Sequence, residues 1–476
     1  MGLKNFTISF SDLSQDSYLR NDVKYHDFLY FSGWNLFDSK SKNLITLKDV
    51  LLDDYILFNY QENEEYKGIP TGQDYIDEDG EIIDSQLVNA ENHPGRLKYK
   101  VSKDNILISS LRLAKSPALY FENKDLSEYV FSNGFYIFKV KEGWSKKFIL
   151  YILRSKRLKN ILDDHIYRGI GISAYKKEDF FKIKIPAIPK HKQDKIIVEL
   201  RPIEAKIQKL KGSVKDPQLV INKILSREFN FDIEEVNNIE KIRYFSISND
   251  FGFRNSNLRS SVRWSKIESI QKFLYKNNPY IEKLGKYIIS TKNGWSPNCR
   301  ESDSDYSVFG LNSISKDGYI KYKDLKYSNQ EKNNISDYYV KENDLFVSRG
   351  NTVDLVALAS VVKKLPEDVY FVFPDLFIRV EPDPEHINKE YLAHLFNSII
   401  GRFYFKYASK GKNQTMVKIS SYELNNFYLP IPPLGLQNKI VTEIRKELNK
   451  QEGIRKKIRM ERSKIDEIIE QTVRPS

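Results

Sequence analysis

The chain contains one sequence unit written twice. After a shift of 244 residues, from Gln193 to Gln437, PAIPKHKQDKIIVE (186–199) aligns without a gap with PIPPLGLQNKIVTE (430–443). Upstream, VSKDNILISS (101–110) matches VKENDLFVSR (340–349), and LRNDVKY (19–25) matches LRSSVRW (258–264). A duplication of this length predicts two similar structural units within one chain.

Both repeats follow the same plan. A stretch rich in aromatic and β-branched residues has period-two runs, such as NDLFVS, which predict strands. A short helix is expected next, at 146–162 and at 389–405. After a polar loop, an extended segment ends in a proline pair and a long helix begins, because proline is tolerated in the first turn of a helix.

The long helices carry apolar residues at coiled-coil spacing. In the first helix these are Ile196, Leu200, Ile203, Ile207 and Leu210, spaced four and three residues apart. The second helix, about 435–471, has Ile440, Ile444, Ile454 and Ile458 in a similar register. We expect the seam of the first helix to pack against the seam that starts at Ile440. The alternative is that each helix packs only on its own domain. Pro202, Gly212 and Pro217 predict a kinked or interrupted first helix.

The expected fold class is therefore α+β. Two globular α/β domains in a pseudo-two-fold repeat would be separated by two long helices that pair as an antiparallel coiled coil. The expected boundaries are 1–188 for the first domain, 189–232 for the first helical region, 233–433 for the second domain and 434–476 for the second helical region.

Composition excludes several classes of protein. The single cysteine, Cys299, excludes an internal disulfide, and six scattered histidines show no zinc-ligand spacing, so we expect no metal site. No apolar run approaches the length of a membrane span, and the first residues do not have the pattern of a signal peptide, which predicts a cytoplasmic protein. The formal net charge of +12 is compatible with a polyanionic partner.

The duplicated plan resembles the specificity subunit of type I restriction-modification systems. The resemblance rests on LPIPPLGLQNKIV (429–441), its weaker copy IPAIPKHKQDKII (185–197), NDLFVSRGNTVDLVALASVV (343–362) and LSREFNF (225–231). The first copy departs from the pattern at Lys190, His191 and Lys192, and SSLRLAKSP replaces SRGNTVDLV.

The resemblance implies two target-recognition domains and no catalytic step in this chain. It implies binding to double-stranded DNA at a bipartite, asymmetric site, with one half-site per domain. It also implies two methyltransferase subunits as partners, which would bind S-adenosylmethionine, and a restriction and translocation subunit that joins for cleavage. No cofactor is expected on the chain itself.

Candidate DNA-contacting residues are those whose side chains reach base edges or phosphates. In the second domain they are Arg349, Asn351, Lys410, Lys412, Asn413, Gln414 and Lys418. Their approximate counterparts in the first domain are Arg112, Lys115, Arg168, Ser173, Tyr175 and Lys176. Further loop candidates are 66–73 and Trp295. The alternative for Arg349 is a structural role, capping a sheet edge or pairing with Asp354.

Two other function classes stay open. NNPY (277–280) is one residue from the Asn-Pro-Pro-Tyr signature of amino-methyltransferases, but no strand followed by a glycine-rich turn precedes it. A coiled-coil adaptor with no nucleic acid partner is the second alternative. Salt-dependent binding to DNA would distinguish it from a recognition subunit.

Overall fold

The computed structural model divides the chain into two compact units. It describes residues 25–26, 28, 33–37 and 43–473, apart from 72–74, 78, 112–117, 122–123, 168–173, 235, 237, 239–265, 268–270, 272–274, 276–277, 300–304, 324, 368 and 412–415. The first unit comprises residues 1–212 and 456–476, and the second comprises 213–455. Each unit therefore contains chain from both repeats.

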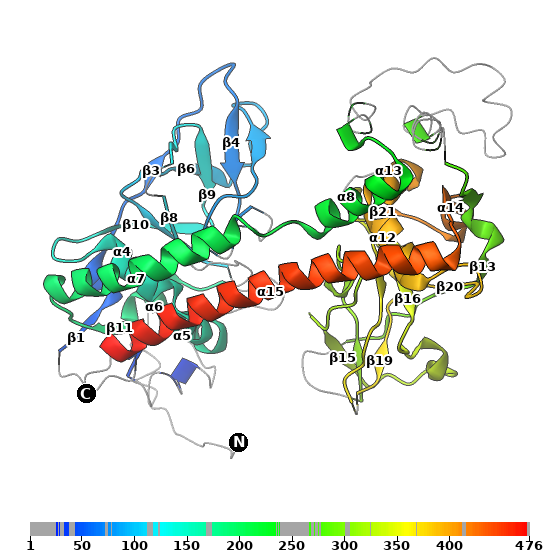
Figure 1. Cartoon of the computed structure of the whole chain (residues 1–476). Coiled ribbons are helices and arrows are strands. Elements are labelled where there is room, and N and C mark those ends of the chain that lie inside the picture. Colours follow the sequence, from blue (N-terminus) through cyan, green and yellow to red (C-terminus); the bar gives the residue numbers. More distant parts are fainter. Residues whose placement is uncertain are drawn as a thin grey trace. The chain divides into compact units, whose positions relative to one another are not determined.

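The first unit is built on two sheets (Figure 1). The antiparallel four-stranded sheet has the order β2 (Leu51–Asp53), β10 (Phe135–Val140), β7 (Ile106–Ser109), β8 (Ala118–Tyr120). The five-stranded sheet has the order β3 (Ile56–Leu57), β6 (Leu97–Lys100), β9 (Tyr129–Ser132), β4 (Tyr66–Ile69), β5 (Gln86–Val88). A two-stranded ladder joins β1 (Leu44–Thr46) to β11 (Lys184–Pro186).

Helices and sheet share the core of the first unit. Successive residues of a strand point to opposite faces, so Ile106 and Ile108 pack with the helices while Leu107 joins a second apolar cluster. The helices and π-turn are α3 (Leu47–Val50), α4 (Lys146–Arg154), α5 (Lys156–Ile161), η1 (Leu162–Ile166), α6 (Lys177–Lys182) and α7 (Lys190–Lys211).

The second unit repeats this topology. Its four-stranded sheet has the order β13 (Ile288–Asn293), β20 (Phe377–Pro382), β16 (Leu345–Ser348), β18 (Ala359–Val361). A three-stranded sheet has the order β15 (Lys326–Ser328), β14 (Tyr306–Val308), β19 (Phe371–Val372). Two short ladders pair β12 (Ile281–Lys283) with β22 (Tyr428–Pro430), and β17 (Gly350–Asn351) with β21 (Val417–Lys418). The predicted duplication and α+β fold class are confirmed.

The second unit also contains several short helices. They are η2 (Leu284–Lys286), η3 (Leu311–Ser313), η4 (Ile335–Tyr338), α12 (Lys389–Asn397), α13 (Ile399–Ala408) and α14 (Ser421–Asn425). This unit also contains α8 (Pro217–Phe229) and the first part of α15 (Leu434–Val473). No described helix is apolar enough over a sufficient length to cross a membrane.

The helices expected at 146–162 and 389–405 are each divided in two, which corrects the prediction. Ser155 and Ser398 adopt extended ψ angles of 141° and 169° and end α4 and α12. Each serine hydroxyl donates to a carbonyl three residues earlier, at 2.7 Å. In the second repeat, a Cβ on Gly401 would lie 2.4 Å from the Phe396 carbonyl oxygen, so only glycine permits this close corner.

A buried glutamine fastens each long helix to its domain. The Oε1 of Gln193 accepts from the backbone N–H of Ser145 at 2.7 Å, and its Nε2 donates to the Ile188 carbonyl at 2.7 Å. Gln437 makes the same contacts with Asn388, at 2.9 Å, and with Pro432, at 2.7 Å. Ser145 and Asn388 are the N-caps of α4 and α12. The identity of Gln193 and Gln437 in sequence therefore reflects one shared structural role.

The first helical region is interrupted where the sequence predicted. α7 continues through Pro202 and ends at Lys211, and α8 begins at Pro217, where proline occupies the first turn and Asp216 is the N-cap. In the second repeat one uninterrupted helix, α15, spans the matching 40 residues.

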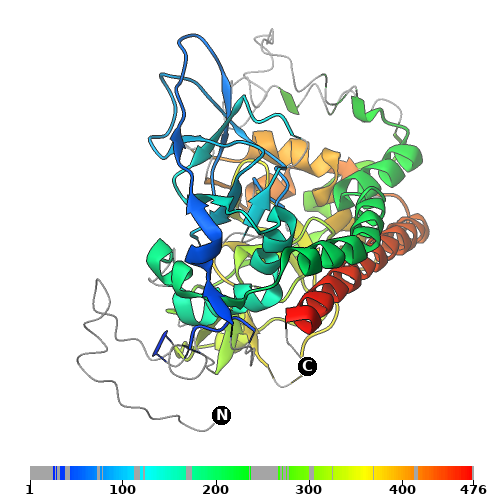
Figure 2. The ribbon, with the colours of Figure 1, turned by 90° about the vertical axis from the view of Figure 1, so that its left-hand side faces the viewer.

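The helix pairing differs in its partners from the prediction. In the first unit, α7 lies beside the last part of α15, and Ile196 and Leu200 share a cluster with Ile469 (Figures 1 and 2). The Lys206 Nζ lies 2.6 Å from the Glu461 Oε1. Because the residue number rises along α7 from Ile196 to Lys206 while it falls along α15 from Ile469 to Glu461, the two helices run antiparallel. Ile440 and Ile444 instead pack with α8 in the second unit, where Ile221 and Leu225 belong to the same cluster. The spacing of the seam is correct, but the partner of the Ile196 seam is the part of α15 around Ile469.

The remaining residues of the predicted seams are not all buried. Ile207 and Ile458 are buried, whereas Ile203, Leu210 and Ile454 are only partly buried. Ile203 packs at the edge of the first-unit core. The apolar interface therefore involves part of the predicted set.

The core of each unit thus includes one long helix from each repeat. Equivalent residues of these helices make a similar hydrogen bond in the two units. Asn222 of α8 accepts through Oδ1 from the Ile399 N–H, at 2.7 Å, in the second unit. Asp466 of α15, which is 244 positions later, accepts from the Lys156 N–H, at 3.3 Å, in the first unit. Both contacts occur at the start of the second short helix.

We predict that Asp466→Asn stabilises the first unit. Burial raises the pKa of Asp466, with the negative charge of Glu470 acting in the same direction. A folded pKa above the unfolded value means that stability falls as the pH rises from the unfolded pKa through the folded one. The amide would keep the contact to Lys156, as Asn222 does in the other unit, and should add about 0.5–2 kcal/mol at neutral pH.

Thermal unfolding between pH 3 and pH 8 tests this prediction. The gain of Asp466→Asn should grow with pH over the range in which the carboxyl ionises. The reciprocal control, Asn222→Asp, introduces a buried carboxylate and should lower the stability of the second unit. A stabilisation of Asp466→Asn that is the same at every pH would contradict the explanation.

Candidate nucleic-acid interface

Four of the predicted DNA-contacting residues lie on adjoining strands. β16 continues through Arg349 into β17, and β17 pairs with β21 in the register Gly350↔Lys418 and Asn351↔Val417. Lys410 and Lys418 exchange backbone hydrogen bonds of 2.9 and 2.8 Å. The ladder therefore brings together Arg349, Asn351, Lys410 and Lys418, which are up to 69 positions apart in the sequence.

The side chains of these residues have different environments. Arg349 is partly exposed and its Nη1 donates to the Asp375 carbonyl at 3.4 Å. The Oδ1 of Asn351 accepts from the Thr352 N–H at 2.8 Å. The structure shows Asp354 paired with Lys406 rather than with Arg349; the Asp354 carboxylate lies 3.3 Å from the Lys406 Nζ.

Lys410 is partly neutralised by a buried carboxylate. Its Nζ lies 2.8 Å from the Oε1 of Glu423, whose side chain is only 1% exposed. Burial acts to raise the pKa of Glu423, but hydrogen bonds from Lys410 and Ser420 outweigh it and lower the pKa. A charged Glu423 leaves Lys410 with less attraction for a phosphate than the exposed Lys418 has.

The Arg349 turn and the loop that carries Trp295 both contact Asp375. Arg349 donates to Asp375, and the Ser296 hydroxyl pairs with the Asp375 carboxylate. The Lys332 Nζ stands 4.7 Å from the centroid of the Trp295 ring. Trp295, a loop candidate from the sequence, therefore lies beside the main cluster.

The equivalent position in the first unit carries different residues. A bridge between Leu111 and Ala174 replaces the β17–β21 ladder, and the Tyr175 N–H donates to the Ser110 carbonyl at 3.2 Å. The matching bond in the second unit joins Ile419 to Arg349, at 2.9 Å. Ser110 therefore occupies the place of Arg349, and Tyr175 occupies that of Ile419.

Tyr175 is corrected from a DNA-contacting residue to a core residue. Its side chain is 3% exposed, its hydroxyl donates to the Ser109 carbonyl at 3.1 Å, and burial raises its pKa well above the usual value. Lys176, the next residue, is exposed just before α6. The other predicted residues lie outside the described part of the chain; these are Arg112, Lys115, Arg168, Ser173, Lys412, Asn413 and Gln414.

A family comparison identifies the second unit. Residues 281–461 match the family described as "Type I restriction modification DNA specificity domain", which covers the β17–β21 ladder and the first part of α15. The chain carries a type I specificity domain. This match supports, for residues 281–461, the family that the sequence resembles.

Three solved structures are similar to the chain. One comes from work on the complex assembly and conformational transition of a type I restriction-modification system (14% identity, 91% of this chain and 97% of that chain, TM-score 0.36). The others are the HsdS subunit from Thermoanaerobacter tengcongensis (14%, 91% and 96%, TM-score 0.34) and the S subunit from M. genitalium (13%, 91% and 96%, TM-score 0.33). No curated protein matches the sequence.

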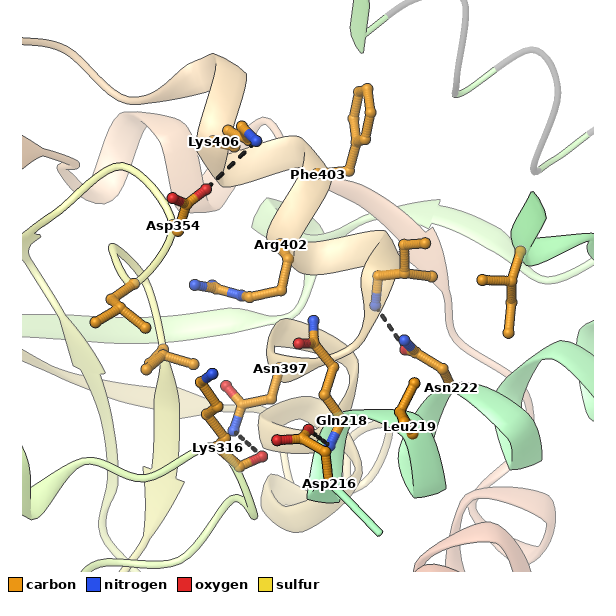
Figure 3. Close-up of a pocket in the computed structure, with 14 residues that line it drawn as sticks. Asp216, Gln218, Leu219, Asn222, Lys316, Asp354, Asn397, Arg402, Phe403 and Lys406 are labelled. Carbon is orange, nitrogen blue, oxygen red and sulfur yellow. Dashed lines mark hydrogen bonds and ion pairs between the residues drawn. The ribbon is translucent and has the colours of Figure 1, made fainter. Parts of the chain in front are cut away.

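The second unit also contains a pocket that the sequence did not predict. It has a volume of about 440 Å³ and lies between α8, α12, α13 and the loop after β17 (Figure 3). Arg402 points into the space between Asp354 and Asn397; Lys316 lies beside Asn397, and Asn222 also lines the pocket. Arg402 belongs to IIGRFYFKYA and lies where the sequence predicted only a short helix.

No group of three or more His, Cys, Asp or Glu side chains that could hold a metal ion occurs in the described part of the chain. The candidate interface of the specificity domain consists of the cations Arg349, Lys410 and Lys418, the amide of Asn351 and the ring of Trp295. These groups suit hydrogen bonding to base edges and attraction to phosphates.

Proposed function

We propose that this chain is the DNA-recognition subunit of a type I restriction-modification complex. The observation that carries the proposal is the specificity-domain match over 281–461, together with a first unit that repeats the same sheet order and the same glutamine contact. Each unit would bind one half of a bipartite DNA site, in the cytoplasm. The chain itself would perform no catalytic step.

The two half-sites would differ in sequence. In the second unit, Arg349 and Asn351 are suited to guanine and adenine edges, and Lys418 is suited to a phosphate. In the first unit, Ser110 stands where Arg349 stands in the second. Two units with a common frame and different reading residues would recognise an asymmetric site.

The partners would be two methyltransferase subunits, which would carry S-adenosylmethionine and methylate adenine. A restriction and translocation subunit would join them for cleavage. The pseudo-two-fold repeat supports two copies of the methyltransferase, because each repeat offers a similar frame.

Co-expression with the methyltransferase encoded beside this chain, followed by mapping of methylated adenines in the host DNA, tests the proposal. We expect one discontinuous motif with two different halves, and no such motif when this chain is omitted. Methylation of a continuous motif, or of none, would contradict the proposal. Binding of the complex to the mapped duplex should also weaken steeply with salt, which a coiled-coil adaptor would not show.

A further inference from the structure

The loop that follows the candidate reading turn ends in the domain core. It comprises residues 352–358 and begins directly after Asn351. Val356 and Ala357 are fully buried, and the Ala357 N–H donates to the Ser348 carbonyl at 2.8 Å. Ala357 has a φ of +58°, which is costly for a residue other than glycine and requires support from its surroundings.

Three side chains from α12 and α13 provide this support (Figure 3). Asn397 accepts from the Ala359 N–H and donates to the Ala359 carbonyl, both at 2.8 Å. Arg402 donates from Nη1 to the Val356 carbonyl at 2.6 Å. Lys406 forms its 3.3 Å ion pair with Asp354. We call Asn397, Arg402 and Lys406 the loop clamp.

The guanidinium of Arg402 is held in place by contacts on both sides, with the loop and with α12. Its Nε donates to the Phe396 carbonyl at 2.9 Å, which fixes the guanidinium against α12. Burial lowers the pKa of Arg402 to about 9, and the charge of Asp354 is the group that opposes this shift. Beside the guanidinium is the 440 Å³ pocket rather than packed side chains. If Arg402 is shortened, the loop can therefore move into open space.

The first repeat retains one of these anchors with a different residue. Arg154, at the end of α4, donates from Nε to the Ala118 carbonyl at 2.9 Å. Ala118 begins β8, as Ala359 begins β18, so Arg154 replaces Asn397. The anchoring of this strand is common to both repeats, while the side chain that provides it has changed.

We propose that Arg402 and Lys406 are positioning residues for DNA recognition, which set the place of Arg349 and Asn351 through the loop 352–358. This inference rests on the proposed function. It predicts that the clamp controls selectivity at one half-site without touching DNA.

The test uses the full chain in complex with its methyltransferase. The kcat/KM for methylation is measured on the mapped duplex and on duplexes with a single base substituted in either half-site. Arg402→Met should reduce discrimination at one half-site about tenfold, the loss of one good base contact, and leave discrimination at the other half-site unchanged. Arg402→Lys, which retains one donor, should recover part of the loss.

A purely structural role would give another result. It would lower the unfolding temperature and the amount of active complex, with discrimination at both half-sites unchanged. Folded Arg402→Met with wild-type discrimination at both half-sites would overturn the inference. Failure of the wild-type complex to methylate any bipartite site would instead overturn the proposed function.

A charge exchange keeps the inference testable if Arg402→Met does not fold. The Asp354 and Lys406 side chains are 71% and 32% exposed, so reversing them should be tolerated. Lys406→Asp alone should reduce discrimination at the same half-site, and the double variant Asp354→Lys with Lys406→Asp should restore it. Equal discrimination in the single and double variants would overturn the inference.

Discussion

Removal of residues 456–476 should unfold the first unit and leave the second unit folded. This C-terminal segment contributes Ile469, which is 1% exposed, and the partly buried Ile465 and Ile468 to the core formed with α4 and α7. It also provides Arg462, whose Nη2 lies 2.7 Å from the Asp79 carboxylate. A fully buried isoleucine contributes about 1.5–3 kcal/mol, so the loss of these three side chains and the ion pair is comparable with the lower part of the typical stability margin of about 5–15 kcal/mol.

Hydrogen exchange followed by mass spectrometry would locate the loss. Backbone protection should disappear in β7 and β10 and persist in β16 and β20. The point variant Ile469→Ala should have the same direction of effect, at about 2–5 kcal/mol. Met460→Ala is the matched control, because that side chain is 56% exposed. Equal loss of protection in both units would contradict the assignment of residues 456–476 to the first unit.

The double variant Arg349→Ala with Asn351→Ala should abolish recognition of one half-site. Each good base contact is worth about 1–3 kcal/mol, so the pair should cost a few kcal/mol there and nothing at the other half-site. Methylation of duplexes with systematic substitutions in each half-site measures this directly.

Lys418→Ala provides the contrast for that experiment. A phosphate contact carries no sequence information, so its loss should weaken binding to all duplexes equally and reduce the dependence on salt by about one ion. Unchanged methylation at every site by the double variant would remove Arg349 and Asn351 from the interface. A uniform loss would place them on phosphates.

The repeat in the sequence was sufficient to predict the two matching units and the starts of the long helices. The two copies align at Gln193 and Gln437, and these residues make the same buried contacts. The proline pairs likewise precede α7 and α15 as predicted. Local rules for helix starts were sufficient here, because the relevant contacts lie within a few residues.

Four features of the structure could not be predicted from the sequence, and each has a physical cause. The apolar pattern continues through Ser155 and Ser398, so nothing in its period indicated the two corners. A four-three spacing shows that Ile196 needs a partner, but it does not specify which turn of a 40-residue helix provides it. Tyr175 was predicted to contact DNA, but tertiary packing buries its ring and satisfies its hydroxyl. The sequence predicted a helix around Arg402, but burial of the guanidinium depends on tertiary contacts that a helix pattern does not reveal.

The division of each unit between the two repeats has a consequence for synthesis on the ribosome. The first unit needs residues 456–476, which are translated 244 positions after Gly212. At typical rates of about 5–20 residues per second, the N-terminal part waits roughly 12–50 s for its last helix. Throughout that interval Ile196 and Leu200 have no partner from α15, so the nascent chain exposes an apolar stripe to which chaperones can bind. Synthesis of residues 456–476, rather than of the first globular region alone, should therefore determine when the first unit becomes resistant to aggregation.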